Sequence, residues 1–421
     1  MNEHPVQLVV EDNLERSRLT VFFRLLLAIP HFVWAFLWGI AVFFAAIANW
    51  VATLATGKPP ESLHRFMCKF IRYLSHLNAY LWLVANPYPG FVGEEGDYPV
   101  DIKLPPPTEQ DRLKTLVRII FAIPALFLSA ALGGAGSFRI PYRGRYGTYS
   151  GGGGGALAGV CAFLGWFAIL ARGRMPKGLR DAGAYSVGYT AQMLAYVLLV
   201  TDRYPNADPT AMLATVERPP QHEVYLVGDA HDLRHSRVLV FFRLPLLIPH
   251  LIWFALWSVA AVVVGILNWF ATLFTGTPAR PFHRFLSAYV RYTLHVYAFG
   301  YLVANPFPGF VGEEGRYPID VVLPERRRQS RWVTGFRLIL AIPAFAVNAA
   351  LGGALSIAAI LTWFVALATG AAPWGLRNLS AYALRYAAQL NAYLFLLTEQ
   401  YPHASPLEGA DEPQQTFDEA T

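Results

Sequence analysis

The feature that most constrains the fold of this chain is a long apolar segment that occurs four times. Each copy contains an arginine six residues before a proline: Arg24 and Pro30, Arg118 and Pro124, Arg243 and Pro249, Arg337 and Pro343. In the first copy, Arg24 is the only charged residue between Leu19 and Thr56. A continuous helix of that length would measure about 55 Å, whereas the hydrocarbon core of a bilayer is about 30 Å thick. The segment is typical of a membrane protein, and it must bend, tilt or lie partly in the interface.

A proline bend accounts for the excess length. Pro30 removes a helical hydrogen bond and clashes with the preceding turn. We therefore expect a first helix over residues 17–29 and a spanning helix from Pro30 to about Thr56. In three copies a tryptophan and a glycine follow the proline at constant spacing: Trp50 and Gly57, Trp269 and Gly276, Trp363 and Gly370. In the second copy, Trp166 and Gly173 keep this spacing only when about 22 inserted residues, 135–156, are removed.

The composition agrees with a lipid environment. Hydrophobic residues make up 55% of the chain and charged residues only 15%, whereas about a quarter of the residues of soluble proteins are charged. The net charge is +6. The basic residues lie beside apolar segments and form no long basic run, so the expected partners are membrane lipids with anionic headgroups rather than nucleic acid. Cys68 and Cys161 provide neither a disulfide framework nor a metal-ligand pattern.

Each long segment is followed by a second candidate helix, so the repeat is a helical hairpin. In the first copy, residues 64–85 return after a polar loop, and Asn86-Pro87 ends the helix because proline disfavours a helical conformation in the preceding residue. Two spans for each copy predict an all-α integral membrane protein of four tandem helical hairpins with about eight transmembrane helices. The alternative is about twelve, with a surface turn at Gly133-Gly134 and at the equivalent Gly39 and Gly352.

A few short strands are expected at one membrane face, over residues 5–10, 98–104 and 224–227. The predicted boundaries are an N-terminal strand and polar segment 1–18, membrane repeats 19–105, 106–205, 238–324 and 325–402, a soluble linker 206–237 and a disordered acidic tail 403–421. The five consecutive glycines of the insertion predict a flexible linker. The third repeat matches the first at an offset of 219 residues, as Arg24 and Arg243 show, so the repeats form two duplicated pairs.

The distribution of basic residues predicts an orientation. With two spans for each repeat, both termini and all four linkers fall on one side of the membrane. Basic residues beside the helix starts are slightly more numerous on this side, which places the termini in the cytoplasm. The polar, acidic N-terminus is unlike a cleaved signal peptide, and the predicted location is the inner (cytoplasmic) membrane.

Several short motifs carry a resemblance to a known family. A helix closes on TGKP at residues 56–59 and on TGTP at residues 275–278, HRF follows at His64 and His283, and the second helices end in NPYPGF and NPFPGF. In these motifs the chain resembles the membrane proteins grouped as domain of unknown function 4389, in which paired copies are common in actinobacteria. The resemblance implies a multi-pass bacterial membrane protein and neither an activity nor a catalytic residue.

The best candidate site is the segment that follows the second helix, here called the exit loop. Residues 86–101 recur as residues 305–320 with thirteen of sixteen positions identical. The acids of the two loops could form oxygen-rich cation sites or dock a basic partner: Glu94, Glu95, Asp101, Glu313, Glu314 and Asp320. The alternative is a loop-to-strand corner whose acids are solvated or paired with nearby arginines.

The four repeated arginines are the second candidate, because charge inside an apolar segment is costly. Arg24, Arg118, Arg243 and Arg337 either anchor their helices to phosphates ahead of a bend or converge on a site for an anion or a lipid headgroup. Histidines also repeat between the halves, in the pairs His31 and His250, His64 and His283, and His76 and His295. No carboxylate lies within one turn of His31, which favours packing over a proton relay.

Two functions remain open at this stage. Duplicated hairpins with bent helices are frequent in transporters, so the first hypothesis is transport or lipid and anion handling through the bundle, with the four arginines near the substrate. The second is a non-catalytic membrane scaffold that binds a protein partner through the exit loops. No catalytic constellation, cofactor motif or metal motif is present, so an enzyme is not expected.

Overall fold

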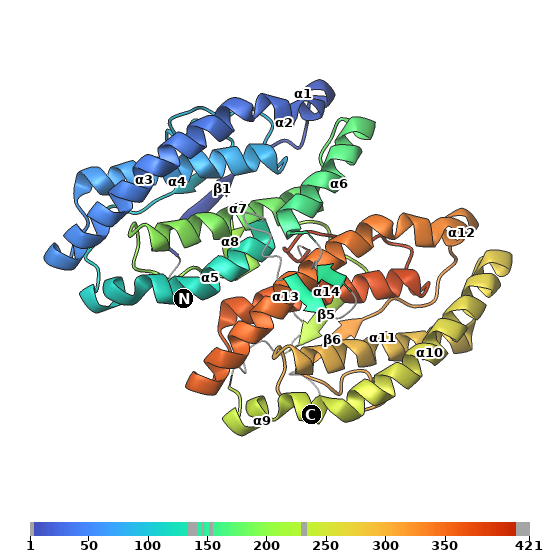
Figure 1. The fold of residues 1–421 in the computed structure, drawn as a ribbon. Helices are drawn as coiled ribbons and strands as arrows, with labels where there is room; N and C mark the ends of the chain where they lie inside the picture. The colour runs from blue at the N-terminus through green and yellow to red at the C-terminus, as the bar shows by residue number, and fades with distance from the viewer. Residues whose placement is uncertain (1–3, 134–140, 145–146, 151–154, 229–233, 410–421) are drawn as a thin grey trace.

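The structure is a computed structural model that describes residues 4–133, 141–144, 147–150, 155–228 and 234–409. Helices dominate the described residues, and three short two-stranded antiparallel sheets accompany them. The two halves of the chain lie side by side, with their long helices running parallel or antiparallel to one another (Figure 1). The helical class and the few short strands predicted from the sequence are confirmed.

The first repeat has the predicted break before its proline. It consists of α1 (Arg18–Phe22), α2 (Arg24–Leu27), α3 (Ile29–Thr56) and α4 (Glu61–Leu81). Pro30 stands in the first turn of α3, where its missing N–H group costs no helical hydrogen bond. Gly57 ends α3 with φ of 80°, a left-handed conformation that glycine adopts without strain.

The other three repeats follow the same plan with local differences. Their helices are α5 (Arg112–Gly133), α6 (Leu157–Arg172) and α7 (Lys177–Val197), then α9 (Arg237–Phe241), α10 (Arg243–Thr275) and α11 (Arg280–Gly300), and last α12 (Arg331–Leu340), α13 (Ile342–Thr369) and α14 (Trp374–Leu394). A short helix, α8 (Pro209–Met212), lies in the linker between the halves. We call the first and third repeats the outer hairpins and the second and fourth the inner hairpins.

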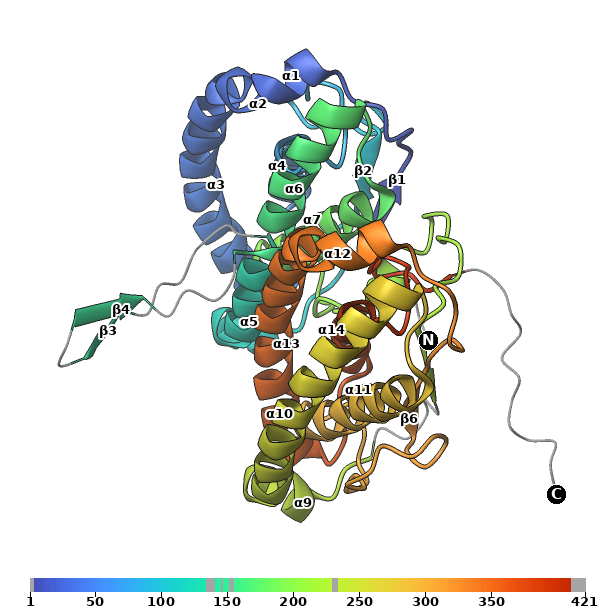
Figure 2. The ribbon, with the colours of Figure 1, turned by 90° about the vertical axis from the view of Figure 1, so that its right-hand side faces the viewer.

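The insertion separates α5 from α6, as the spacing of the second copy predicts. Within it, β3 (Pro141–Gly144) and β4 (Gly147–Ser150) form an antiparallel hairpin that lies away from the helices (Figure 2). Most of the five-glycine run falls outside the described residues, so its prediction as a flexible linker is not tested.

Each half of the chain contains one further antiparallel strand pair. β1 (Gln7–Val10) pairs with β2 (Val100–Lys103), and β5 (Tyr225–Gly228) pairs with β6 (Ile319–Val322). In each half, a strand that precedes the outer hairpin meets a strand that follows it. The predicted strands at residues 5–10, 98–104 and 224–227 contain β1, β2 and most of β5.

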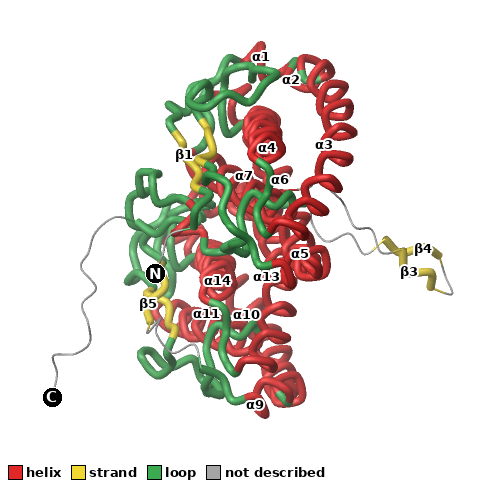
Figure 3. The backbone as a smooth tube through the Cα atoms, turned by 90° about the vertical axis from the view of Figure 1, so that its left-hand side faces the viewer, coloured by secondary structure: helices red, strands yellow, loops and turns green. Residues whose placement is uncertain are grey.

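The elements form three layers, which Figures 2 and 3 show from opposite sides. The long apolar helices α3, α5, α13 and α10 make the first layer, and the second helices α4, α7, α14 and α11 pack behind them. Strands and loops make the third layer, behind α4 and α11. Contacts of α13 with α5 and α6 join the halves in the first layer.

In the first layer the usual placement of polar and apolar side chains is reversed, with polar residues on the buried face of the helix and apolar residues on its outward face. The buried face of α3 carries His31, Asn49 and Thr53, whereas its outward face exposes large apolar side chains such as Phe36 and Phe43. Four stretches among the described residues are long and apolar enough to cross a membrane: residues 24–56, 112–133, 243–275 and 342–369. This is compatible with a membrane location.

The predicted count of about eight spans, and the alternative of about twelve, is not confirmed. The second helices are the reason. They carry charged and polar residues along their length, such as Arg65, Arg72 and His76 of α4, and bury many of them against neighbouring elements. They are long enough to cross a bilayer but not sufficiently apolar.

The fourth repeat extends past its predicted end at residue 402. Ala404, Ser405 and Leu407 are buried, and the Ser405 hydroxyl donates to Asp181 of α7 over 2.8 Å. The packed structure therefore includes the first part of the segment predicted as a disordered tail. Residues 410–421 of that segment lie outside the described residues.

Candidate functional site

Arg24 is buried inside the protein, with 3% of its surface exposed. Its guanidinium group donates to the carbonyl oxygens of Tyr80 at 2.7 Å, Ala85 at 3.2 Å and Asn86 at 3.2 Å. It also lies 4.2 Å above the centre of the Tyr80 ring. These groups belong to the C-terminal end of α4 and the start of the exit loop.

The same arrangement occurs in every repeat. Arg118, Arg243 and Arg337 donate to the carbonyls of Tyr196, Phe299 and Tyr393, and each guanidinium lies within 4.6 Å of the ring centre of that residue. Each arginine has a further partner of its own: Asp202 for Arg118, the Asn305 side chain for Arg243 and the Gln329 side chain for Arg337.

Helix termination explains this repeated contact. The last carbonyls of a helix have no partner within it. After each second helix the chain turns through a leucine in the left-handed region, with φ between 60° and 64° at Leu83, Leu199, Leu302 and Leu396. Each arginine donates to carbonyls around this turn, and its charge complements the negative end of the helix dipole.

The arginines predicted to bind an anion or headgroup are therefore held by internal partners. Each side chain binds the end of its own hairpin, and the structure does not bring the four together. The arrangement favours helix capping over binding of an external anion. Sequence reasoning missed the partners, although the aromatic residue follows the arginine by 56 positions in three repeats, for example from Arg24 to Tyr80.

The exit loop carries a polar network on α4. Asp101 in β2 accepts hydrogen bonds from the backbone N–H groups of Gly96 and Ile102, both at 2.7 Å, and lies 3.0 Å from His76 Nε2. Arg72 Nε lies 3.2 Å from the same carboxylate, and the Arg72 guanidinium also pairs with Glu95 at 3.0 Å. Burial alone raises the pKa of Asp101, but the hydrogen bonds from His76 and the two N–H groups outweigh it, so its pKa is lowered.

The second outer hairpin repeats this network atom for atom. Asp320 lies 3.1 Å from His295 and 3.1 Å from Arg291, which also pairs with Glu314 at 3.1 Å. Glu313 pairs with Arg316 at 3.0 Å, and Glu94 is exposed. Of the predicted acids, Glu95, Asp101 and their counterparts thus pair with arginines. No group of three or more histidine, cysteine or acidic residues in the described part of the chain could hold a metal ion.

The course of the exit loop is fixed by contacts with both helices of its hairpin. Phe91 stacks on His31 at a centroid distance of 4.2 Å, and its carbonyl accepts from Trp34 Nε1 at 2.8 Å. Gly93 has φ of 65° and lies so close to α4 that a Cβ would clash with the Lys69 carbonyl. The loop therefore crosses the edge of α3 and follows the middle of α4. Its counterpart does the same with Phe310, His250 and Trp253.

The repeated histidines have structural contacts. His31 Nδ1 lies 3.1 Å from the Tyr73 hydroxyl, and His250 Nδ1 lies 3.0 Å from that of Tyr292. His64 lies beside Cys68, with 3.6 Å between Nδ1 and Sγ. These contacts agree with the packing role favoured by the sequence.

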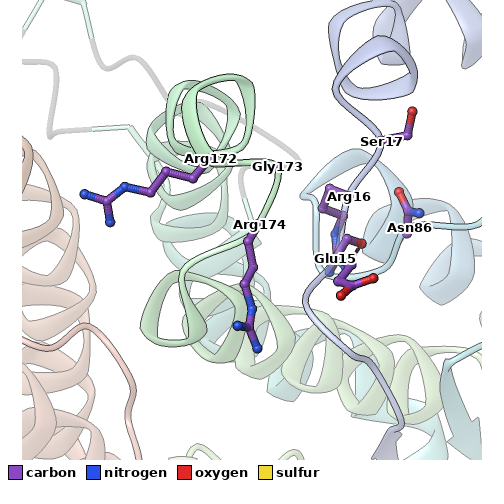
Figure 4. Close-up of a pocket in the computed structure, with 7 residues that line it drawn as sticks. All are labelled: Glu15, Arg16, Ser17, Asn86, Arg172, Gly173 and Arg174. Atoms are coloured by element: carbon purple, nitrogen blue, oxygen red, sulfur yellow. Dashed lines mark hydrogen bonds between the residues drawn. The ribbon is translucent and has the colours of Figure 1, made fainter.

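A polar pocket of about 440 Å³ lies where α1 begins and α6 ends. Its lining includes Glu15, Arg16, Asn86, Arg172 and Arg174 (Figure 4). The side chains do not converge, because Arg172 and Arg174 point away from Arg16. Arg16 itself is buried and pairs with Asp12 at 2.8 Å. The pocket therefore assembles no ligand-binding group of charges.

These features define a class of protein: a mostly helical protein built from four repeats, with a layer of apolar helices on one side and polar exit loops on the other. The sequence profile of one family, Domain of unknown function (DUF4389), matches four times, at residues 18–92, 154–207, 237–311 and 331–405. Since these matches cover more than half of the chain, the protein belongs to this family. No curated protein and no solved structure matches it.

Proposed function

We propose that the protein is a non-catalytic membrane scaffold that lies in one leaflet. In this arrangement the apolar layer of α3, α5, α13 and α10 is embedded with its helices parallel to the membrane plane. The third layer, with both exit loops, faces the water and binds a soluble protein partner. The cytoplasmic leaflet of the inner membrane is the proposed location, because anionic lipids there attract a basic protein.

The observation that carries this proposal is the position of Glu95. This residue pairs with Arg72, which lies at the midpoint of α4, and 73% of its side chain is exposed. If α3 and α4 crossed the bilayer together, Glu95 would lie near the centre of the hydrocarbon. A charge there costs about 2.5–3.5 kcal/mol, and lipid-exposed irregular loops do not occur at that depth. Glu314, 79% exposed, stands in the same position beside Arg291 on α11.

In the in-plane orientation, the apolar side chains of α3 lie in hydrocarbon, the aromatic rings at its edge lie among headgroups, and the glutamates of the exit loop lie in water. The outward face of α3 meets hydrocarbon, as in amphipathic helices that lie about 5–10 Å deep in the interface. Trp34 and Phe91, at the edge between α3 and the exit loop, lie at headgroup level, where aromatic rings are enriched. Glu94 and Glu95 then face water.

The transport hypothesis has less support. It needs Arg24 and its three counterparts near a substrate, but their guanidinium groups are bonded to backbone carbonyls at the hairpin ends. An arginine in that role contributes to the stability of its hairpin rather than to passage of an anion.

Single-cysteine accessibility tests the orientation. In a Cys68→Ser, Cys161→Ala background, cysteines would replace Lys58, Arg174, Thr277 and Ala371 in the four hairpin turns, and Glu94 and Glu313 in the exit loops. For the in-plane scaffold, all six should react with an impermeant maleimide from the same side, compared between intact cells and inverted vesicles. If the turn cysteines react from one side while the exit-loop cysteines are unreactive or react from the other side, the hairpins span the bilayer and the proposal fails.

Partner capture tests the scaffold function. Glu94→Gln combined with Glu313→Gln should release a co-purifying protein while membrane association is unchanged. Glu109→Gln, on the connection before α5, is the matched control and should retain the partner. A partner that stays bound after both exit-loop changes would contradict binding through these acids.

A further inference from the structure

A groove of about 550 Å³ lies on the outer edge of the second half. It is formed by three elements: Trp257 of α10, the first turns of α11 with Arg280, Arg284 and Phe285, and Val311 of the second exit loop. Trp257 and Phe285 meet edge to face with 6.0 Å between ring centres. The groove therefore has a wall built from apolar side chains and two arginines at its rim.

The two arginines at the rim of the groove contribute no hydrogen bond or ion pair to the described part of the fold. Arg280 and Arg284 are exposed and stand one helical turn apart on α11. Neither has a hydrogen-bond or ion-pair partner within the described residues. This distinguishes them from Arg243 and Arg291 of the same hairpin, which are buried and bonded. Two free guanidinium groups at this spacing suit a phosphate group.

The apolar wall continues onto the face that meets lipid in the proposed orientation. On α10, Trp253 and Leu256 precede Trp257 and are exposed. Val311 is exposed as well, on the edge where the exit loop passes α10. An acyl chain can therefore pass from the surface of α10 into the groove without crossing a polar barrier.

We propose that this groove binds one anionic phospholipid. The phosphate lies between Arg280 and Arg284, and an acyl chain lies against Trp257, Phe285 and Val311. This inference rests on the proposed function, because the lipid reaches the groove from the leaflet in which α10 is embedded.

The first half provides a natural comparison at equivalent positions. Trp38, Phe66 and Val92 preserve the apolar wall, and Arg65 corresponds to Arg284. Glu61, however, stands where the second half has Arg280. A carboxylate at the rim repels a phosphate and attracts the arginine one turn away. The phospholipid site therefore belongs to the second half.

Native mass spectrometry of the full-length protein in neutral detergent tests the proposal, with phosphatidylglycerol and phosphatidylcholine of identical chains as probes. Arg280→Gln with Arg284→Gln should weaken phosphatidylglycerol binding about tenfold or more, since each basic group near a phosphate strengthens binding severalfold. Phosphatidylcholine binding should weaken less, because the choline ammonium group offsets the charge of its phosphate. Arg280→Lys with Arg284→Lys keeps the charge and should restore phosphatidylglycerol binding to within about threefold. Glu61→Gln with Arg65→Gln is the matched control and should change it less than about twofold.

Three results would overturn the lipid site. They are wild-type phosphatidylglycerol binding by the double glutamine variant, an equal loss in the first-half control, and displacement of the lipid by glycerol phosphate as effectively as by phosphatidylglycerol. A result that contradicts the lipid site can be distinguished from one that contradicts the in-plane orientation of the scaffold. The cysteine labelling reports the orientation alone, whereas these variants, all at exposed positions, change only the rim of the groove.

Discussion

The outer and inner hairpins share one sequence plan, but they occupy different environments. In the most apolar windows of the outer helices α3 and α10, only 17% and 11% of residues are buried, compared with 39% for the inner helices α5 and α13. The second helices differ in the same sense, because α7 is buried along nearly its whole length, whereas the first turn of α4 is largely exposed. The repeat therefore serves both as the edge and as the centre of one layered structure.

One position of the repeat shows how the sequence makes this difference. In the outer hairpins His76 and His295 approach the acids of the exit loops, whereas glutamines replace them in the inner hairpins. Gln192 and Gln389 donate to the carbonyls of Val6 and Val224, at 2.9 Å each. At this position the outer hairpins bind the charged exit loop, whereas the inner hairpins make neutral hydrogen bonds to the chain just before β1 and β5.

The largest loss of stability is expected from replacing the capping arginine, which the outer and inner hairpins share. Replacing the capping arginine of either an inner hairpin (Arg337→Met) or an outer hairpin (Arg24→Met) leaves buried carbonyls without donors. Each change should lower the free energy of unfolding by about 3 kcal/mol or more, measured by denaturant titration in detergent micelles. The exposed Arg18→Met is the control. A loss below about 1 kcal/mol in both variants would show that capping is not what these arginines contribute.

Close packing at the inner hairpins predicts the next effect. A Cβ at Gly375 would lie 2.9 Å from the Asp208 backbone nitrogen and 3.0 Å from that of Ala207. Gly375→Val should therefore cost about 2–3 kcal/mol, because backbone cannot move aside as a side chain can. The equivalent outer position, Ser62, is exposed, and Ser62→Val should be nearly neutral. Equal losses in thermal unfolding of the two variants would remove the distinction between inner and outer hairpins.

The exit-loop network predicts an effect that only the outer hairpins carry. Asp101→Asn with Asp320→Asn should cost about 1–2 kcal/mol for each network at pH 7, because a charge-assisted contact with arginine is lost. The folded-state pKa of Asp101 lies below its usual value of 3.8, so its stabilisation is complete above that value and is lost as the pH falls through the folded pKa. The double variant should therefore show a flatter decline of stability below about pH 4 than the wild type. Parallel pH profiles would contradict this role.

The smallest effect is expected from removing the insertion that distinguishes the two inner hairpins. Deletion of residues 135–156 joins Gly134 to Leu157, in register with Gly353 and Ala354 of α13. The joined segment should form one helix, and the free energy of unfolding should change by no more than about 1 kcal/mol. Helix content by circular dichroism and the unfolding midpoint provide the measurements. A large loss of stability would show that the insertion contributes to folding.

Periodic features of the sequence were sufficient to predict much of the fold. The constant spacing from Arg24 to Pro30 to Gly57 predicted the break before α3 and the end of that helix. The second helices were harder, because a helix of 21 residues that ends in an apolar stretch, such as α4, resembles a span until its buried partners are known. Which face of α4 meets β2 depends on strand pairing between residues about ninety positions apart, and local pattern contains no information about it.

The sequence identified the residues of the candidate sites, but it did not predict which groups most of them contact. Arg24 was identified because of its apolar surroundings, yet its role depends on the left-handed turn at Leu83, which composition does not reveal. For Asp101 and Glu95, the alternative of pairing with nearby arginines agrees with the observed contacts of Arg72. The rim arginines Arg280 and Arg284 were not singled out, because exposed arginines on an amphipathic helix are common unless a groove lies beside them.

The contacts between the two inner hairpins are reciprocal, and this bears on how the protein arose. Gly178 at the start of α7 packs against Ala404 and Ser405, and the equivalent Gly375 at the start of α14 packs against Ala207 and Asp208. Such an exchange of identical contacts is the property of a two-fold symmetric dimer interface. Each half also has its own closing strand pair, β1 with β2 and β5 with β6. A gene half as long would encode a subunit able to pair with itself through this surface, and fusion of two such genes would allow each half to diverge while the partnership was kept.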